Sequence, residues 1–365
     1  LWIKFTSLSL PLSNSFFLNF TMHTTIHFLN TLTDIRGRLS VYASFAGLKS
    51  LWRVGLGVCA LLGFQGLAAQ GFQFVALGDL PYGAPAVSYA PYRSLIAQIN
   101  RESPAFSIHV GDFKSGSTPC SNEEFQAQLG HFSMFEKALV YTPGDNEWTD
   151  CHRANNGAHD PLERLGKLRQ MFFQGGQSLG QQPLTLTRQP PVHPQHAAYV
   201  ENAMWVHEGV VFVSLHIVGS NNNFEARQPQ AVQEFFSRDA ANVAWIEHAF
   251  AQAKALQAKA LVVAFQADVF ESKSRWEDFP AHSGFRRSVG ETLLPLAAQS
   301  NVPVLVIHGD SHEFKFDQAF QWQKKPLPSV YRLVVPGAQD VRAVMVSVDT
   351  TRPSVFQVRL ISPRR

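Results

Sequence analysis

The residues with the clearest potential for chemistry are aspartates that each follow a glycine directly. Four such pairs stand just beyond short apolar runs: Gly78-Asp79, Gly111-Asp112, Gly144-Asp145 and Gly309-Asp310. Glycine lets the backbone turn sharply, so each carboxylate can point into the crevice beyond the carboxyl ends of strands. Carboxylates gathered there repel one another unless a cation neutralises them. The set of four therefore indicates a metal site, although any single aspartate is equally well explained as a turn former or helix cap.

Five motifs in this order resemble those of the calcineurin-like metallophosphoesterases: Gly78-Asp79-Leu80-Pro81, Gly111-Asp112-Phe113, Pro143-Gly144-Asp145-Asn146-Glu147, Phe265-Gln266-Ala267-Asp268 and His308-Gly309-Asp310-Ser311-His312. They span nearly all of the chain after residue 70. The resemblance implies an α/β protein with a four-layer α/β/β/α sandwich in a single domain. It also implies a centre for two metal ions and hydrolysis of phosphomonoesters or phosphodiesters.

The motifs differ from the family pattern mainly where the family has histidines. Pro81 stands at the histidine of the usual Asp-x-His, and Asn146 stands at the histidine that aids the leaving group. Asp145 replaces a metal-binding asparagine, while Gln266 and Asp310 replace two further histidines. Two of these changes exchange a neutral ligand for a carboxylate. They favour a changed metal preference over the loss of the site.

Carried over position by position, the resemblance implies two sets of ligands. One ion is held by Asp79, Asp112 and His312, and the second by Asp112, Asp145, Asp310 and Gln266. Asp112 bridges the two ions. Oxygen-rich coordination suits Mn²⁺ or Mg²⁺, which we place first among the divalent ions, ahead of Ca²⁺, Fe²⁺ and Zn²⁺.

Two such ions lower the pKa of a shared water and hold phosphoryl oxygens, so that a metal-activated hydroxide attacks phosphorus. The expected catalytic residues are Asp112, Asp145, Asn146 and His152. Asn146 cannot protonate a leaving alkoxide, and His152 is our candidate for that step, although an ordinary exposed loop histidine is an equally good interpretation. His216, inside an apolar run, is more simply a core residue.

The missing histidines motivate an alternative from another class, a noncatalytic exported module that binds metal on the same fold. A hydrolase that acts on carbonyl or sulfate esters through the same metals is a further alternative. The substrate is expected to be a small-molecule or exposed phosphoester. The sequence contains no Gly-x-Ser-x-Gly elbow, P-loop or dinucleotide fingerprint, which disfavours those enzyme classes.

The elements that position these motifs alternate between short apolar runs and helical patterns, as in α/β proteins. Strands are predicted at 72–77, 105–110, 138–142, 197–207, 210–218, 260–265, 302–308, 341–348 and 356–360, and helices at 92–101, 121–137, 160–173 and around 243–253. A capping box formed by Ser121 and Glu124 opens the second helix, and Asp160 with Pro161 opens the third. The stretch 175–196 is predicted to be a long loop.

The segment before residue 71 reads as an export signal. Lys49 and Arg53 precede the apolar run 54–62, and Ala68 and Ala69 offer a cleavage point, which predicts a signal peptide at 49–70. We expect 1–48 to be an upstream extension or an artefact of start-site choice, and 71–365 to be one phosphoesterase domain. The apolar run is too short to span a membrane. The mature protein is therefore expected to be periplasmic or secreted, with no membrane span.

Charge and cysteine usage agree with this division. The whole chain has a net charge of +3, and residues 1–70 alone carry +4. The remainder therefore has a net charge of about −1. This gives no sign of nucleic-acid binding. Cys59 lies in the signal segment, and Cys120 and Cys151 remain as an even pair in an oxidising compartment, where we predict a disulfide. Both cysteines lie close to the metal-site motifs.

Overall fold

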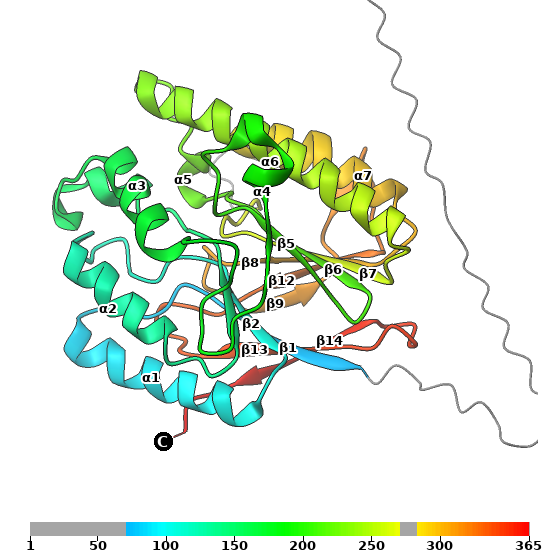
Figure 1. Cartoon of the computed structure of the whole chain (residues 1–365), viewed down its shortest axis with the longest axis horizontal. Helices are drawn as coiled ribbons and strands as arrows, with labels where there is room; N and C mark the ends of the chain where they lie inside the picture. The colour runs from blue at the N-terminus through cyan, green and yellow to red at the C-terminus, as the bar shows by residue number, and fades with distance from the viewer. Residues whose placement is uncertain (1–70, 271–282, 365) are drawn as a thin grey trace, which may run out of the picture. The chain divides into compact units, whose positions relative to one another are not determined.

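The computed structural model describes residues 71–270 and 283–364. The extension predicted at 1–48 and the signal peptide predicted at 49–70 lie outside the described residues. Among the described residues, two large β-sheets pack face to face, and helices cover the outer face of each sheet (Figure 1). This is the predicted four-layer α/β/β/α arrangement.

The first sheet has the strand order β14-β13-β1-β2-β3. Its strands are β1 (Phe72–Leu77), β2 (Phe106–His109), β3 (Ala138–Tyr141), β13 (Ala343–Val348) and β14 (Phe356–Ile361). β1, β2 and β3 run parallel, whereas β13 and β14 are antiparallel. The alternating pattern of β13 and β14, expected from the sequence, places this antiparallel pair at one side of the sheet.

The second sheet has the order β4-β5-β6-β7-β8-β12-β9. Its strands are β4 (Thr187–Arg188), β5 (Ala203–His207), β6 (Val210–Ser214), β7 (Ala260–Ala264), β8 (Val304–His308), β9 (Lys315–Asp317) and β12 (Val330–Val334). The central strands β6, β7, β8 and β12 are parallel. A small ribbon of β10 (Gln321–Trp322) and β11 (Lys325–Pro326) stands apart from both sheets.

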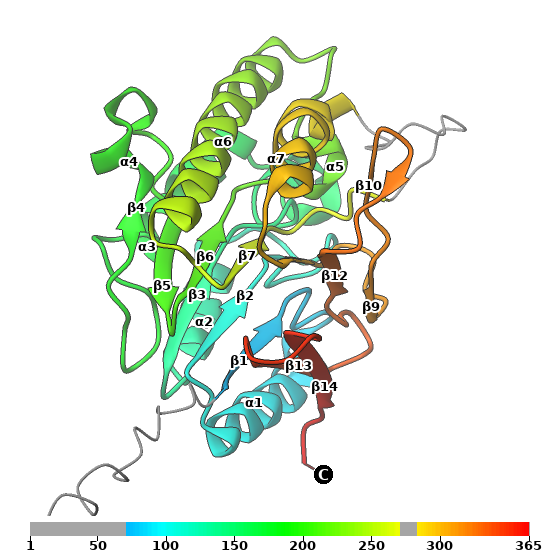
Figure 2. The same cartoon turned by 90° about the vertical axis from the view of Figure 1, so that its right-hand side faces the viewer.

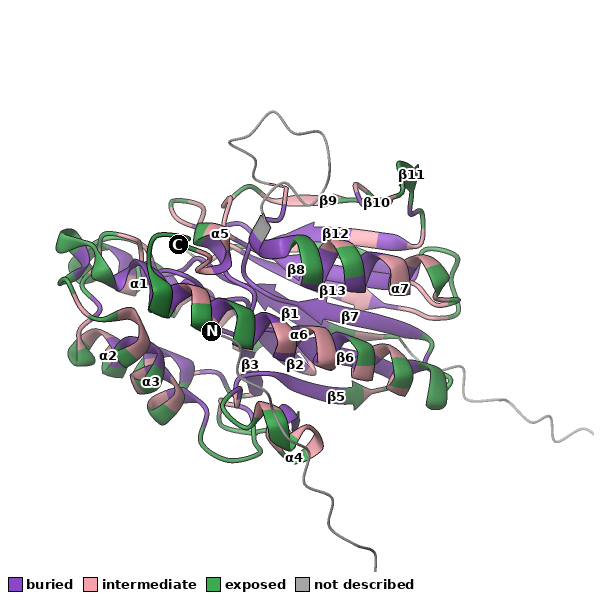
Figure 3. Ribbon diagram, turned by 90° about the horizontal axis from the view of Figure 1, so that it is seen from above, coloured by how far each residue is buried: buried purple, intermediate pink, exposed green. Residues whose placement is uncertain are grey.

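Three apolar cores separate the four layers. Between the sheets, Phe74 and Phe106 of the first meet Phe212 and Val262 of the second. Outside the first sheet lie α1 (Pro85–Glu102), α2 (Asn122–Phe132) and α3 (Pro161–Phe172). Outside the second sheet lie α6 (Pro229–Ala255), the π-helix η5 (Arg286–Leu293) and α7 (Leu294–Gln299), with α6 and α7 side by side (Figure 2). Figure 3 shows the buried strands beneath α6 and α7, whose outward faces are exposed.

The remaining helical segments are short and lie in loops. They are η1 (Thr149–His152), η2 (Ala154–Asn156), α4 (Gln189–Val192), η3 (Pro194–His196), α5 (Gly219–Asn222) and η4 (Ser283–Phe285). No helix within 71–270 and 283–364 combines the length and the apolar character needed to cross a membrane.

Several predicted boundaries need correction. α1 begins at Pro85, seven residues before the predicted start at 92, because a proline fits the first helical turn. α2 ends at Phe132 and not near 137, whereas its cap is confirmed: the Ser121 side chain accepts a hydrogen bond from the Glu124 N–H. The stretch 175–196 is not only loop, since it contains β4 and α4, and β5 begins at Ala203 and not at 197.

Candidate metal centre

The parallel strands of both sheets end at the same edge, and the polar motifs follow these ends. Asp79, Asp112 and Asp145 come just after β1, β2 and β3, while Gln266 follows β7 and Asp310 follows β8. The loops that follow the strands of the two sheets also contact each other directly. The Asp310 N–H of the second sheet donates to Asp79 Oδ1 of the first at 3.1 Å.

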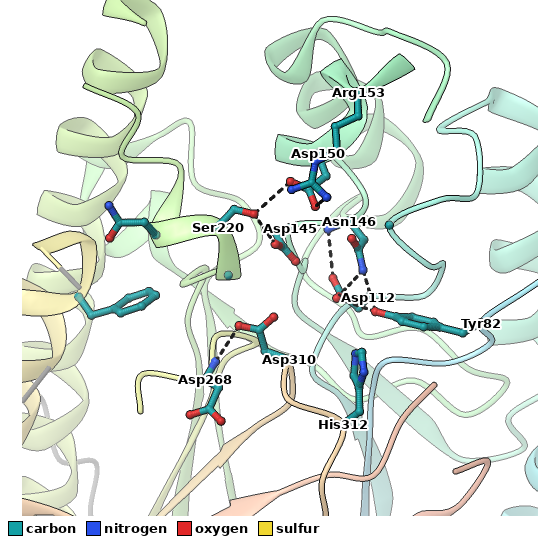
Figure 4. A pocket seen from close by; sticks show the side chains of 14 residues that line it. Tyr82, Asp112, Asp145, Asn146, Asp150, Arg153, Ser220, Asp268, Asp310 and His312 are labelled. Atoms are coloured by element: carbon teal, nitrogen blue, oxygen red, sulfur yellow. Dashed lines mark hydrogen bonds and ion pairs between the residues drawn. The ribbon is translucent and has the colours of Figure 1, made fainter. Parts of the chain in front are cut away.

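Three of these aspartates form a compact carboxylate cluster. One carboxylate oxygen from each of Asp112, Asp145 and Asp310 lies within 4.8 Å of the others. They line a cavity of about 470 Å³, together with Tyr82, Gly116, Asn146, Asp150, Arg153, Gly219, Ser220, Asn221, Asp268, Phe285 and His312 (Figure 4). The spacing is short enough for one cation to contact all three carboxylates.

The other half of the predicted centre, Asp79 with His312, is arranged differently. The side chain of Asp79 is fully buried, and its Oδ1 lies 3.5 Å from Nε2 of His312. The His312 ring packs edge-on against Tyr82, with ring centroids 5.1 Å apart. Pro81, which stands in place of the family's histidine, leaves this half with two predicted ligands besides the shared Asp112.

Asp112 accepts hydrogen bonds from three neighbouring side chains and from one backbone group. The Tyr82 hydroxyl and Asn146 Nδ2 donate to its Oδ2 at 2.8 and 2.7 Å, and the Asn146 backbone N–H donates to its Oδ1 at 3.1 Å. Gln266 Nε2 lies 3.3 Å from both Asp112 Oδ2 and Asp145 Oδ1. Gln266 Oε1 in turn accepts the Gly219 N–H at 2.6 Å, so the amide presents its NH₂ group, and not its oxygen, to the carboxylates.

The electrostatics of the cluster are unfavourable for free carboxylates. Burial raises the pKa of Asp112 well above its ordinary value, and the charges of Asp145, Glu147 and Asp79 raise it further. Burial likewise raises the pKa of Asp79, partly offset by His312. Without a cation, protonation is the only relief for such groups. A bound divalent ion would supply the missing positive charge and reverse these shifts.

Four of the predicted ligand residues have a backbone conformation that costs energy. Their φ angles are positive: 52° for Asp79, 55° for Asp112, 75° for Asp310 and 63° for His312. The left-handed region is uncommon for residues other than glycine and costs of order 1 kcal/mol or more at each. Backbone strain of this kind clusters at functional sites, and here it coincides with the residues that the motifs single out.

The glycines of the motifs are required by close packing. A Cβ atom at Gly144 would clash with Asp112 Oδ1 and with the Asp112 backbone nitrogen, and one at Gly309 would clash with the Asp79 carboxylate. Each carboxylate therefore packs directly against the glycine of a neighbouring motif. At two of the four Gly-Asp pairs, glycine is therefore required because a neighbouring carboxylate occupies the space of a Cβ atom, and not only because the chain turns sharply.

A loop after β6 completes one wall of the cavity. Ser220, Asn221, Asn222 and Asn223 all have positive φ angles, between 49° and 60°. Ser220 Oγ lies 2.8 Å from Asp145 Oδ2 and 3.0 Å from Asp150 Oδ1, so it connects two carboxylates across the wall. This Asn-rich segment is thus a left-handed turn that contributes Ser220 to the cavity.

The buried Arg238 on α6 fixes this turn from behind. Its guanidinium donates to Asn222 O at 3.0 Å and to His216 O at 2.8 Å, and it pairs with Glu234 at 2.6 Å. His216 itself is fully buried, with Nδ1 2.7 Å from Glu201 Oε1. This agrees with its interpretation as a core residue.

The adjacent part of the wall is formed by η1, which the disulfide links to the segment around Cys120. Cys120 and Cys151 are bonded, as predicted, with a Cα–Cα distance of 5.8 Å. Asp150, the neighbour of Cys151, pairs with Arg153 at 2.6 Å. Burial and the nearby Asp145 raise the pKa of Asp150 to about 6.

The structure gathers most of the predicted site residues but not all of them. Asp112, Asp145, Asn146, Asp310 and His312 line the cavity. Asp79 and Gln266 are buried beneath it. His152 is exposed and lines an adjoining cavity instead, with Nδ1 2.7 Å from Thr149 O.

Sequence reasoning missed Tyr82, Asp150, Arg153 and Ser220. Tyr82 directly follows the first motif, and Asp150 and Arg153 flank Cys151 and His152, so proximity to a motif was the available signal. Ser220 lies 75 residues from Asp145. Only the folded structure places them together.

The chain forms two sheets with helices on both outer faces, and the five motifs lie where the parallel strands of both sheets end. This is the four-layer arrangement that the resemblance to the calcineurin-like metallophosphoesterases implies. No protein-family model matches the chain, and no curated protein matches it.

Solved structures that align with the chain do so at low identity. A dimetal phosphatase from Danio rerio aligns with a TM-score of 0.45 and 10% identity over 80% of this chain and 99% of its own. GAP50, the anchor in the inner membrane complex of Plasmodium, gives 0.44 and 11% over 81% and 90%. A purple acid phosphatase from yellow lupin seeds gives 0.43 and 13% over 80% and 54%. At these values, function has to follow from the residues of this chain.

Proposed function

We propose that this protein is a metal-dependent phosphoester hydrolase whose carboxylate cluster binds divalent cations. The observation that carries the proposal is the approach of carboxylate oxygens from Asp112, Asp145 and Asp310 to within 4.8 Å at the wall of a cavity. The pKa of Asp112 is raised by burial and by its acidic neighbours, which is the condition that a cation relieves. The donors are mainly carboxylate oxygens, which favour Mn²⁺ or Mg²⁺.

The residues fit two inequivalent ion positions. Asp112, Asp145 and Asp310 would hold one ion, and Asp79 and His312, with Asp112, would hold the other. We assign Gln266 an orienting role, because its Oε1 accepts the Gly219 N–H and its NH₂ group faces Asp112 and Asp145. The carboxylate-only position is the more complete of the two.

Bound divalent cations acidify water and neutralise phosphoryl oxygens, which is the chemistry of a phosphoesterase centre. The chain orients the reactants around them. Arg153, on the cavity wall, donates N–H groups to phosphoryl oxygens, and Asn146 and Tyr82 hold the Asp112 carboxylate in place. The oxygen of water bonds to phosphorus, and the bond from phosphorus to the leaving oxygen breaks.

The proton released by water ends on the departing alcohol, so the products are an alcohol and phosphate. Asn146 has no acidic proton to give. We assign the proton transfer to His152, whose Nδ1 is engaged by Thr149 O and whose Nε2 is then the exchanging atom. This histidine lines an adjoining cavity, which shares Asp150, Arg153 and Ser220 with the metal-site cavity.

We further propose that the protein is exported to the periplasm or secreted. The Cys120–Cys151 disulfide supports this compartment, because disulfides persist in oxidising environments. The signal-like segment 49–70 points the same way.

Metal content and turnover measured on the same protein test the proposal. We expect about two ions per chain in the wild type by mass spectrometry after incubation with Mn²⁺ or Mg²⁺, and a sharp fall in Asp112→Ala. Hydrolysis of p-nitrophenyl phosphate and its diester analogue should depend on the added metal and disappear in the variant. Bound ions without hydrolysis of any phosphoester would support the noncatalytic module instead. If no ions bind, both interpretations fail.

A further inference from the structure

A second cavity continues from the metal centre toward the surface. It has a volume of about 310 Å³, and three residues line it together with the metal-site cavity: Asp150, Arg153 and Ser220. A third hollow of about 540 Å³ shares Asp160, Leu162 and Gln230 with the second. The three form one groove that leads from the carboxylates to the N-terminal ends of α3 and α6. We refer to the second and third cavities together as the leaving-group groove.

The walls of the leaving-group groove are rich in neutral hydrogen-bonding groups. Asn223, Gln228 and Gln230 contribute amides, and Gln228 and Gln230 are exposed. The partly buried Leu162 and the buried Ala231 give the groove an apolar surface. Amides that can both donate and accept, beside apolar surface, suit a ligand with hydroxyl groups on a carbon frame.

The charges along the groove offer an anionic ligand no net attraction. Two exposed carboxylates, Asp160 and Glu225, line the second cavity. Its guanidinium belongs to Arg153, which pairs with Asp150 at 2.6 Å and which the proposed function assigns to the phosphate at the metal centre. A second phosphate group would meet these carboxylates, and the remaining basic side chain that lines the described part of the second cavity is His152.

The same carboxylates are poorly suited to capture a cation. Asp160 Oδ1 accepts the Glu163 N–H at the start of α3, at 2.9 Å. Glu225 Oε1 accepts the Arg227 N–H at 3.1 Å. These backbone donors offset part of each negative charge, and both carboxylates are open to solvent, which screens the remainder.

We propose that the leaving-group groove binds the alcohol part of the substrate, and that this part is neutral and hydroxyl-rich, as in a sugar phosphate or polyol phosphate. The inference rests on the proposed function, since the phosphate group is placed at the metal centre. Hydrolysis then transfers the phosphoryl group from the sugar oxygen to water, and the freed sugar oxygen takes up the proton that the water loses. Arg153 and Ser220 mark the junction between the phosphate and the sugar.

The test compares substrates that differ in the leaving group alone. A hexose 6-phosphate is measured against p-nitrophenyl phosphate and a nucleoside 5′-diphosphate, on the full chain with Mn²⁺. For each substrate, kcat/KM is compared with the value expected from the acidity of its leaving group. On this scale we expect the hexose phosphate to rank above both p-nitrophenyl phosphate and the nucleoside diphosphate. The variant Gln230→Leu should lower the ratio of kcat/KM for hexose phosphate over p-nitrophenyl phosphate about tenfold, the loss of one well-formed hydrogen bond.

Charge reversal at the groove provides a second arm. Glu225→Lys should raise kcat/KM for the nucleoside diphosphate relative to the hexose phosphate several-fold. Glu291→Lys makes the same change on the exposed face of η5, away from the groove, and should leave all three values as in the wild type. A general effect of charge would appear in both variants and would overturn the assignment of the groove.

Binding of the free hexose separates this inference from the proposed function. Saturation-transfer NMR should detect hexose on the wild type and lose the signal in Gln230→Leu, whether or not any phosphoester is hydrolysed. Hexose binding without turnover would retain the groove and refute the hydrolase. Turnover of p-nitrophenyl phosphate with no hexose binding, and with no preference for the hexose phosphate, would refute the groove and retain the hydrolase.

Discussion

Removing one charge from the carboxylate cluster should stabilise the metal-free protein and weaken its response to metal. Asp310→Asn is the suitable change, because its Oδ2 accepts the Asp268 N–H and an asparagine oxygen can keep that hydrogen bond. The Asp310, Asp112 and Asp145 oxygens lie within 4.8 Å of one another. At an effective dielectric constant of about 20, two unit charges at that distance repel by about 3 kcal/mol.

The wild type should gain stability when a cation binds. A ligand at a hundredfold excess over its dissociation constant stabilises the folded state by about 2.7 kcal/mol. For a domain of this size, roughly 2 °C of melting temperature corresponds to 1 kcal/mol, so Mn²⁺ should raise the wild-type Tm by roughly 5 °C. In Asp310→Asn we expect a metal-free Tm several degrees above that of the wild type, and a metal-induced rise less than half as large.

Differential scanning calorimetry with chelator, then with Mn²⁺, Mg²⁺, Ca²⁺ or Zn²⁺, measures both effects. Asp349→Asn serves as a matched control, because this aspartate lies in the turn between β13 and β14 and its Oδ1 accepts the Thr351 N–H, which asparagine can also do. A wild-type Tm that no cation changes, together with a metal-free Asp310→Asn no more stable than the wild type, would refute the electrostatic reasoning.

Three further outcomes follow from the structure. Gly144→Ala should abolish metal binding in equilibrium dialysis, because its Cβ would clash with the Asp112 carboxylate. Burial lowers the pKa of His216 to about 4, so as the pH falls below about 6.5 the unfolded chain binds the proton before the folded one does. The free energy of unfolding should therefore fall by up to about 3 kcal/mol toward pH 4. His216→Asn should remove this pH dependence from the stability measured by urea unfolding. Replacing both Cys120 and Cys151 by serine should cost about 4 kcal/mol in urea unfolding, since the bridge closes a loop with a sequence separation of 31.

The sequence predicted the parts of the fold that have a local signature. Apolar runs that end in Gly-Asp located β1, β2 and β8, and the capping box located the start of α2. The missed elements lack such signatures. The π-helix η5 does not follow the 3.6-residue period, and strands of two or three residues such as β9 are too short to show a pattern.

The same distinction holds within the site. Asp112 and Asp145 are encoded by motifs that follow predicted strands. Ser220 is not, because its role depends on a left-handed turn held by Arg238, and nothing local specifies that contact. The amide orientation of Gln266 is also a tertiary property, since it is set by the Gly219 N–H from the loop after β6.

The cost of building the carboxylate cluster is itself an argument for a bound cation. Four predicted ligand residues have left-handed backbone angles, each at a cost of order 1 kcal/mol or more. Repulsion within the cluster adds about 3 kcal/mol for each ionised pair. The sum is comparable with the entire stability of an ordinary domain, about 5–15 kcal/mol. Hydrogen bonds to Asp112 from Tyr82 and Asn146 offset part of this cost, and a bound divalent cation would offset the repulsion that remains.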